Sequence, residues 1–308
     1  MRPHTYADNP LDRSERWRHD ETWLSQKISE ENSRFLPFNN LNVFITNDIQ
    51  PRLGWITYNR LTQIGWDDKP IFLGILGQAT YFAADISNIA SAVDELSKTE
   101  KVRLEDARTA AELLTGPESG ILAQAKSQVD WHNRNRFCSS CGGQTEMRRG
   151  GHMRKCTGCG VEHFSRTDPV IIVVVSSGTH CLLGQSRGRL SRMNMYSALA
   201  GFVDQAETIE EAVTREVMEE AGIKIENIQY HSSQPWPFPW SLMIGCHAEA
   251  VNTDINMDTE EMIDVKWFPR KEIMLALKGK SDSLTLPGPL AIAHHLIKSW
   301  ALSNISKS

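Results

Sequence analysis

Three glutamates in one short stretch are the strongest chemical signal in this chain. Residues 201–223 read GFVDQAETIEEAVTREVMEEAGI, with carboxylates at Glu216, Glu219 and Glu220. At about 100° per residue along a helix, Glu216 and Glu220 point into an apolar stripe and Glu219 flanks it. The apolar members of that stripe are Ile209, Ala212, Val213 and Val217. Because an unpaired buried carboxylate is costly or shifts its pKa, a positive group should lie beside this face.

The positive group expected there is a divalent metal ion. Carboxylates that converge without histidine or thiolate suit hard Mg²⁺ or Mn²⁺, and the adjacent Arg215 can pair with one of them. Metal ions held in this way neutralise phosphate charge and lower the pKa of an attacking water. The plain alternative is a solvated, glutamate-rich helix, and the register of the glutamates in the apolar stripe disfavours it.

Local signals predict where this helix begins and ends. Thr208 followed by Glu211 forms a capping box, which predicts a helix start at about Thr208. Gly222 is suited to follow the C-terminus, where a positive φ is often needed.

The stretch resembles the Nudix box, the signature of hydrolases that cut diphosphates linked to another moiety. The matched positions are Gly201, Glu207, Arg215, Glu216, Val217, Glu219, Glu220, Gly222 and Ile223. The resemblance implies a loop–helix–loop in which Glu216, Glu219 and Glu220 bind metal and Arg215 orients them. It departs from the usual box at Ala206, where the family has glycine, and this puts only the turn geometry in doubt.

Four cysteines form a second chemical group. Cys138 and Cys141 make one CxxC knuckle, and Cys156 and Cys159 make another after fourteen residues. Two such knuckles complete a tetrahedral Zn²⁺ site, and four thiolates leave no open position, so we expect this zinc to be structural. The alternative of a redox pair does not explain two knuckles at this spacing.

Composition excludes several classes of protein. The 308 residues are 40% hydrophobic and 23% charged with a net charge of −5, which describes a globular protein of two or three domains. A protein that binds nucleic acid mainly through phosphates would usually be more basic. No apolar run approaches the ~18 residues of a membrane span, and the N-terminus lacks an apolar signal core. Paired cysteines at metal spacing favour a reducing cytoplasm.

The chain is expected to form three domains. Residues 1–130 should be a small α+β domain, 131–166 the zinc ribbon and 167–308 the Nudix domain, an α/β/α sandwich with a mixed sheet. No internal repeat and no catalytic constellation is evident in the first domain. Strands are expected there over 41–45, 52–61, 70–76 and 79–84, and helices over 89–95, 105–114 and 121–133.

The third domain should be built on a buried central strand. Val170–Val175 is an unbroken β-branched run. Its partners are expected over 181–185, 196–201 and 224–230. A basic loop with Arg187, Arg189 and Arg192 precedes the box, and it is either a phosphate-attracting loop or a solvated one.

A proline-rich stretch follows the last of these strands. Gln234 to Ser241 reads QPWPFPWS, and its three prolines are not expected to continue a normal sheet. The stretch is either a packed loop or a stiff wall that presents Trp236 and Phe238 to a planar ring.

This stretch, the upstream four-cysteine ribbon and the size of the first domain resemble the NADH pyrophosphatases among the Nudix hydrolases. The resemblance implies a homodimer that cuts NADH or NAD⁺ into nicotinamide mononucleotide and AMP, and that also removes NAD caps from RNA. It implies an additional metal-binding acid, Glu261, and a metal-binding backbone carbonyl at Ala200. Phe164, which reaches the neighbouring subunit's site, is followed by Ser165 where the family usually has proline. The implied substrate-binding residues are Phe164, Phe202, Gln234, Pro235, Trp236, Pro237, Phe238, Pro239, Trp240, Ser241 and Ala293.

Two alternatives stay open. The first keeps the Nudix chemistry but takes another nucleoside diphosphate derivative, such as ADP-ribose, and the QPWPFP stretch argues against it. The second is an RNA-binding reader that uses the basic ribbon residues Arg148, Arg149 and Arg154, and the complete set of glutamates argues against a pure reader.

Overall fold

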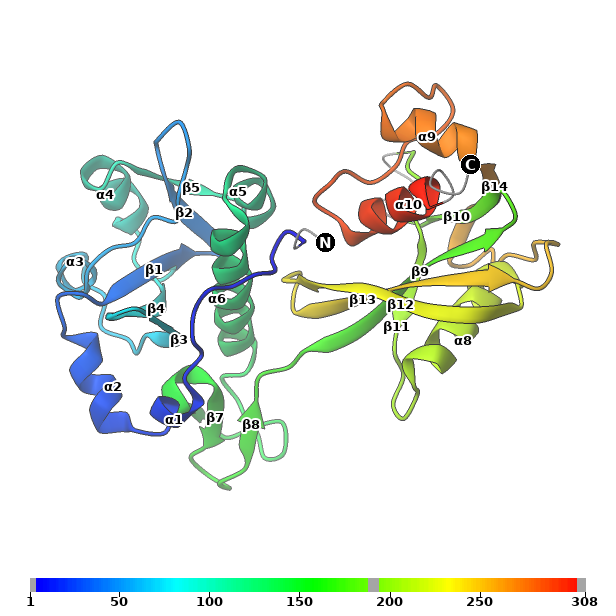
Figure 1. The fold of residues 1–308 in the computed structure, drawn as a ribbon. Coiled ribbons are helices and arrows are strands. Elements are labelled where there is room, and N and C mark those ends of the chain that lie inside the picture. Colours follow the sequence, from blue (N-terminus) through cyan, green and yellow to red (C-terminus); the bar gives the residue numbers. More distant parts are fainter. Residues whose placement is uncertain (1–3, 188–193, 304–308) are drawn as a thin grey trace. The chain divides into compact units, whose positions relative to one another are not determined.

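The computed structural model describes residues 4–187 and 194–303, which form two compact units (Figure 1). The first unit runs through Thr167 and also contains Trp236–Trp240, and the second contains the rest of the chain. Arg189 and Arg192 of the predicted basic loop lie outside the described residues. No helix among the described residues combines the length and apolar character that crossing a bilayer requires.

The first unit is built on a five-stranded sheet with the order β3-β4-β1-β2-β5. The strand β1 pairs parallel with β4 and antiparallel with β2, and the other pairs are antiparallel. The strands are β1 (Arg34–Asn39), β2 (Asn42–Thr46), β3 (Ile71–Leu76), β4 (Ala79–Asp85) and β5 (Val102–Glu105).

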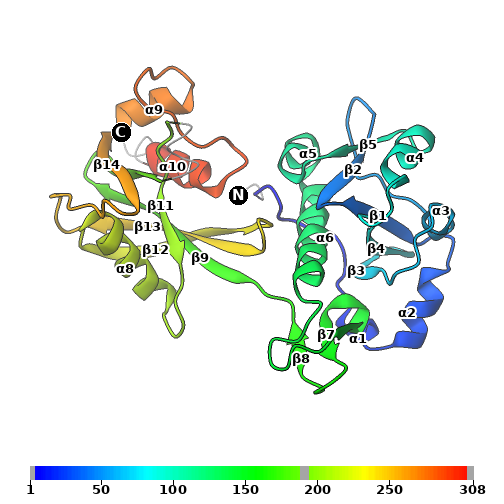
Figure 2. The same cartoon turned by 180° about the vertical axis from the view of Figure 1, so that it is seen from behind.

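Helices cover both faces of this sheet (Figures 1 and 2). The long helix α6 (Gly116–Arg134) packs on one face, and α3 (Tyr58–Gln63) and α4 (Ala92–Thr99) pack on the other, where Leu61 and Leu96 join the aromatic core. The remaining helices are α1 (Glu15–Arg18), α2 (Glu21–Ile28) and α5 (Ala107–Leu113).

The cysteine ribbon belongs to the first unit and forms a three-stranded antiparallel sheet. Its hairpin tip packs closely against the larger sheet, because an added Cβ at Gly151 would lie 2.9 Å from the Ile71 side chain. The ribbon consists of β6 (Thr145–Arg148), the 3₁₀ turn η1 (Arg149–Gly151), β7 (Met153–Cys156) and β8 (Glu162–Phe164).

The second unit is built on the sheet β12-β13-β9-β10-β14, with β11 paired to β9. The buried strand β9 lies at its centre, as the Val170–Val175 run predicts, and it pairs parallel with β13. The strands are β9 (Asp168–Ser177), β10 (His180–Ser186), β11 (Leu199–Phe202), β12 (Ile225–Trp236), β13 (Ser241–Ala250) and β14 (Met262–Pro269).

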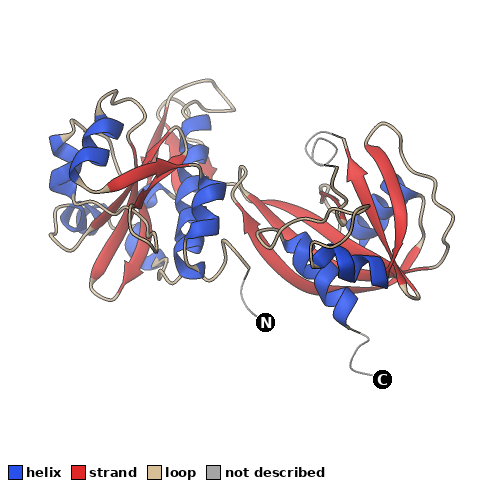
Figure 3. Cartoon of the chain, turned by 90° about the horizontal axis from the view of Figure 1, so that it is seen from above, coloured by secondary structure: helices blue, strands red, loops and turns tan. Residues whose placement is uncertain are grey.

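Helices again lie on both sides of the sheet, which gives an α/β/α sandwich (Figure 3). The helix α8 (Ile209–Ala221) packs on one face through Val213 and Val217. The helices α9 (Arg270–Leu277) and α10 (Ile292–Leu302) cover the other through Ile273 and Leu296.

Three sequence expectations are wrong. Residues 52–61 are not one strand, because Thr57 accepts a hydrogen bond from the backbone of Arg60 and begins the helix α3. The strand β12 continues through Pro235 to Trp236, since an edge strand tolerates a residue without an N–H donor. Ile209, assigned to the buried stripe, is 37% exposed because it lies in the first turn of α8.

The two units share a repeated topology that the sequence analysis did not anticipate. When β11 is set aside, the two sheets have the same strand order. In both, the first strand pairs antiparallel with the second, and it pairs parallel with a later strand, β4 in the first unit and β13 in the second. The repeat lies in the topology, and side chains have diverged so far that no sequence period remains.

Candidate active site

The helix α8 is positioned by the signals that the sequence predicts. Thr208 is its N-cap, and the reciprocal bonds of a capping box with Glu211 are present. Gly222 ends the helix in the left-handed conformation, with φ 69°. Among the buried residues of α8 are both Glu216 and Glu220, so the register of carboxylates within the apolar stripe is confirmed.

Arg215 organises the acidic side chains around α8. Its guanidinium donates two hydrogen bonds to Glu207, at 2.6 and 2.8 Å. It also donates to Glu216 at 2.9 Å and to Glu219 at 3.0 Å. These bonds hold the pKa of Glu207 down at about 2 and raise the pKa of Arg215. Every donor on this cation therefore has an anionic or carbonyl acceptor, since Phe202 O takes the remaining bond.

Glu220 is the unsatisfied carboxylate of the group. Its side chain is 6% exposed, and its Oε2 atom is buried without a hydrogen-bond partner among the described residues. Burial, and next the nearby charge of Glu216, raise its pKa to about 8. Burial likewise raises the pKa of Glu216, although Arg215 opposes this shift. A buried oxygen of this kind is energetically tolerable only when protonated or when it binds a cation.

The strand β11 brings backbone close to these carboxylates. An added Cβ at Gly201 would lie 1.9 Å from Glu216 Cδ, so only glycine leaves room for this carboxylate. The preceding Ala200 forms a backbone hydrogen bond with Glu220. The following Phe202 is 59% exposed, so its ring is free to stack on a ligand.

Glu261 is a further acidic residue near this group and acts on it through its charge. It is exposed, just before β14, and its charge is felt at both Glu216 and Glu220. The oxygens of these acids do not converge as tightly as the cysteine thiols. Of the residues described, only the cysteines form a group of three or more donors within 4.8 Å of one another.

The donor set nevertheless fits a hard divalent cation. All its side-chain donors are carboxylates, one of them has an orphaned buried oxygen, and burial together with like charges raises the pKa of two of them. A cation replaces the proton on such a group and relieves the repulsion, and oxygen-only donors suit Mg²⁺ or Mn²⁺.

Gln234 holds the start of α10 in place. Its Oε1 accepts from Ile292 N and its Nε2 donates to Leu290 O, both at 2.8 Å, and the side chain is fully buried. These bonds fix the first turn of the helix that carries Ala293, which is itself buried. Ser241, at the start of β13, is half-buried.

The aromatic stretch Trp236–Trp240 lies in the first unit. The rings of Trp236 and Phe238 each lie 5.9 Å from the buried ring of Tyr6. The Arg108 guanidinium stands 3.8 Å from the Phe238 ring centre, and Lys126 donates to Pro237 O at 2.8 Å. These contacts agree with the interpretation of this stretch as a packed loop. A role of Trp236 and Phe238 in substrate binding stays a prediction.

The ribbon presents a further predicted residue at its surface. Phe164 is 56% exposed, and the Arg149 guanidinium lies 5.7 Å from its ring centre. Neighbouring Arg148 pairs with Glu146, and Arg154 is held by Thr145 and His132. Two of the three arginines proposed for RNA binding thus have partners within the ribbon.

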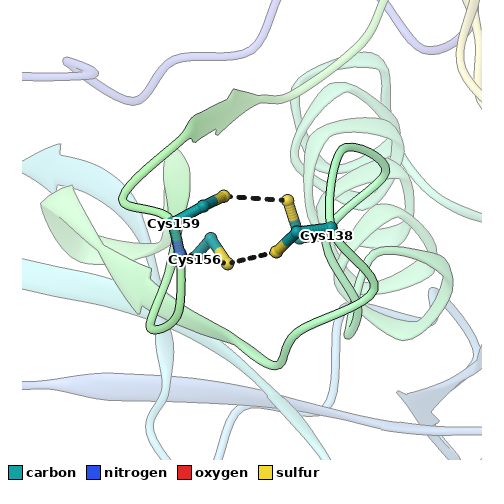
Figure 4. Close-up of side chains that lie close together, drawn as sticks. Cys138, Cys156 and Cys159 are labelled. Atoms are coloured by element: carbon teal, nitrogen blue, oxygen red, sulfur yellow. Dashed lines mark hydrogen bonds between the residues drawn. The ribbon is translucent and has the colours of Figure 1, made fainter.

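The four cysteines converge as their spacing predicts, and Figure 4, which labels Cys138, Cys156 and Cys159, shows their sulfurs turned toward one another. Cys138 Sγ lies 3.7 Å from Cys159 Sγ, and Cys141 Sγ lies 3.5 Å from Cys156 Sγ. His163 Nε2 lies 3.3 Å from Cys138 Sγ, outside the four-sulfur set. Four sulfurs in this arrangement fit a closed, structural Zn²⁺ site.

One functional residue lacked an assigned role in the sequence analysis. Glu207 holds Arg215 through both carboxylate oxygens. The box spacing marked the position, but only the folded loop shows which partner it binds.

Fold and site together define a Nudix hydrolase, and comparisons with known proteins agree. Residues 165–286 match the family model of the NUDIX domain. Residues 32–131 match an NADH pyrophosphatase-like rudimentary NUDIX domain, and residues 133–164 match an NADH pyrophosphatase zinc ribbon domain.

Relatives match along most of the chain. The NAD-capped RNA hydrolase NUDT12 of Homo sapiens is 35% identical over 97% of this chain and 73% of its own length. An NAD-capped RNA hydrolase of Schizosaccharomyces pombe is 30% identical over 98% and 94%. The mitochondrial NAD(P)H pyrophosphatase NUDT13 of Mus musculus is 38% identical over 72% and 68%. The chain therefore belongs to the NADH pyrophosphatase family of Nudix hydrolases.

Proposed function

We propose that this hydrolase cuts the pyrophosphate of NAD(H) into nicotinamide mononucleotide and AMP, and that it also removes NAD caps from RNA 5′ ends. The observation that carries the hydrolytic part is the buried, unpartnered oxygen of Glu220 beside Glu216. The choice of substrate is supported by relatives named for NAD(P)H and NAD-capped RNA.

The proposed metal site consists of Glu216, Glu219, Glu220, Glu261 and the Ala200 carbonyl. A bound Mg²⁺ or Mn²⁺ supplies charge neutralisation at the pyrophosphate and a lowered pKa for the attacking water. Arg215 holds two of these carboxylates in place through Glu216 Oε1 and Glu219 Oε2.

The rest of the proposed site selects the nucleotide. Phe202 stacks on a base, because its exposed ring directly follows Gly201. Gln234 acts by fixing the start of α10, and so places Ala293. A cytoplasmic homodimer, in which Phe164 serves the partner's site, completes the proposal.

Incubating the purified protein with NADH and Mn²⁺ or Mg²⁺ tests the substrate, with products identified by mass. Reduced nicotinamide mononucleotide plus AMP is the expected result. Intact NADH alongside cleaved ADP-ribose would assign the chain to the other Nudix substrates, and no cleavage of either would favour the RNA-binding reader.

Replacing Glu220 by glutamine tests the metal assignment. We expect kcat/KM for NADH to fall by about 10²–10³, the range seen when one oriented charge-stabilising group is lost. The exposed Glu210, in the first turn of α8, provides the matched control through Glu210→Gln. A Glu220→Gln enzyme that kept most of its turnover would rule out this site.

A further inference from the structure

The repeated topology allows the two sheets to be aligned residue by residue. The turn at 39–42 closes the β1–β2 hairpin with the same pairing as the turn at 177–180 between β9 and β10. In this alignment Phe35 corresponds to Val173. Phe35 lies in the core that contains Leu61 of α3, and Val173 lies in the core that contains Val213 of α8.

Partner strands confirm this register. Phe35 pairs with Ile56 and Phe82, as Val173 pairs with Leu199 and Cys246, and all of these residues belong to the corresponding cores. The residues that directly precede these partner residues in the chain correspond in the same way and face the opposite side of the sheet. Trp55 corresponds to Ala198, and Tyr81 corresponds to Gly245.

Small residues at these positions let a helix pack directly on the hydrolase sheet. An added Cβ at Gly245 would lie 2.9 Å from Ile292 Cδ1 and 3.1 Å from Leu296 Cδ2, both on α10. The first unit has two large rings there instead. Trp55 and Tyr81 meet edge to face with ring centres 5.0 Å apart, and neither is fully buried.

The two rings border a cavity of about 430 Å³ at the start of α6, the helix that corresponds to α10. Pro117 and Ile121 of α6 line it together with Leu76. This volume lies in the range of about 300–1,000 Å³ that is usual for small-molecule sites, so the cavity can hold a molecule as large as a nucleotide.

Glu118 supplies a polar group that lacks a partner. Its Oε1 accepts from Leu53 N at 3.2 Å, while its Oε2 is buried with no hydrogen-bond partner among the described residues. The side chain is only 13% exposed, and burial raises its pKa. Arg52, 76% exposed, lies 3.7 Å from the same carboxylate at the cavity wall.

We propose that this cavity binds a nucleotide whose ring carries an amino group, such as AMP. The ring packs against Trp55 and Tyr81, and its amino N–H donates to Glu118. The nucleotide is bound and not cleaved, because Glu118 is the one carboxylate among the residues that line this cavity, whereas Glu216, Glu219 and Glu261 all act on Glu220 in the hydrolase site. This site is separate from the hydrolytic one, and the inference does not rest on the proposed function.

Calorimetric titration of the full chain with AMP, without added divalent metal, tests the proposal. We expect Trp55→Ala to weaken AMP binding at this site at least about tenfold, since base–aromatic stacking is lost. Glu118→Gln should weaken AMP by a similar factor but leave purine riboside 5′-monophosphate unchanged, because that nucleotide has no amino group. Inorganic phosphate alone should not saturate the site.

The hydrolase site provides the control, through Phe202→Ala. AMP binding that disappears in Phe202→Ala and persists in Trp55→Ala and Glu118→Gln would overturn the proposal, as would an absence of binding to the unmodified chain. Thermal unfolding of each variant verifies the fold. If Trp55→Ala does not fold, Glu118→Gln decides alone, because its side chain has nearly the same shape.

Discussion

Two glutamates of this site have pKa values that are shifted in opposite directions. The Arg215 guanidinium contacts both oxygens of Glu207 and holds its pKa down at about 2, whereas burial raises the pKa of Glu220 to about 8. The sequence predicts that Glu216 and Glu220 turn inward, since periodicity determines the direction of a helical side chain. It does not predict which carboxylate Arg215 binds, because that depends on the path of the loop before α8.

Gly201→Ala tests how much the site depends on close backbone approach. The new Cβ would lie 1.9 Å from Glu216 Cδ, so the carboxylate must move, and 1 Å misplacements cost on the order of 10²-fold in rate. We expect kcat for NADH to fall by about that factor while the protein stays folded. Gly116→Ala, where an added Cβ has no neighbour within 4 Å, serves as the control. Equal activity of both variants would contradict the close packing of Glu216.

At the scale of elements, the hairpin of β12 and β13 is the least expected feature. The rings of Trp236 and Phe238 at its tip contact Tyr6, and the Phe238 ring also contacts Arg108 and Lys126. The prolines predict a stiff tip. No local sequence signal identifies the residues, far away along the chain, that this tip contacts. The sequence also does not predict the helix α3, because the aromatic and β-branched residues before and at its start are types that favour strands.

Phe238→Ala separates packing from substrate binding. The ring lies 3.8 Å from the Arg108 guanidinium and 5.9 Å from Tyr6, so we expect a loss of roughly 2 kcal/mol in unfolding free energy from lost packing and cation–π contact. Chemical denaturation measures it. Phe202→Ala is the comparison, since its ring is 59% exposed and should alter KM with little change in stability. The opposite pattern would favour the substrate wall.

The contact between ribbon and α6 should weaken in acid. His132 Nε2 donates to Gly151 O, and its Nδ1 accepts from Arg154, which requires the neutral ring. Burial lowers the pKa of His132 to about 4, below the ~6.5 of an unfolded chain. The unfolded state therefore binds more protons, and stability is fully present above pH ~6.5 and falls as pH drops toward 4.

Melting temperature against pH measures this effect. The contribution of His132 across the whole window should reach roughly 3 kcal/mol, and His132→Gln should make the profile less steep between pH 6.5 and 4. A slope should remain, because burial also lowers the pKa of His152 to about 4. His19→Gln, at an exposed histidine, should leave it unchanged. An identical slope in all three proteins would show that His132 does not carry the dependence.

At the scale of the whole molecule, the sequence anticipates the Nudix sandwich and the ribbon but not the second Nudix-like sheet. The Nudix box, the two CxxC knuckles and the β-branched strand can each be predicted because each has a pattern within a short stretch of sequence. In the rudimentary repeat, the helix α3 that corresponds to α8 contains no glutamate, and the shared strand order is not revealed by periodicity alone. The structure divides into two units with the ribbon in the first, and the three-domain division stays a prediction.

Mixing two inactive variants tests the proposed homodimer. If Phe164 serves the neighbouring site, Phe164→Ala and Glu220→Gln should complement each other in mixed dimers. Random mixing of equal amounts then restores about one quarter of the unmodified activity, since half the dimers are mixed and each has one complete site. Activity no higher than that of the separate variants would place Phe164 in its own subunit's site or outside catalysis.

The position of Trp236–Trp240 within the first unit has a consequence for synthesis on the ribosome. The chain up to Thr167 is complete before the aromatic tip has been translated, about 70 residues later. At 5–20 residues per second, this leaves roughly 4–14 s. During that interval Tyr6, Arg108 and Lys126 lack the rings that later cover them. A nascent chain that stalls between these points should be recognised by chaperones at this uncovered surface.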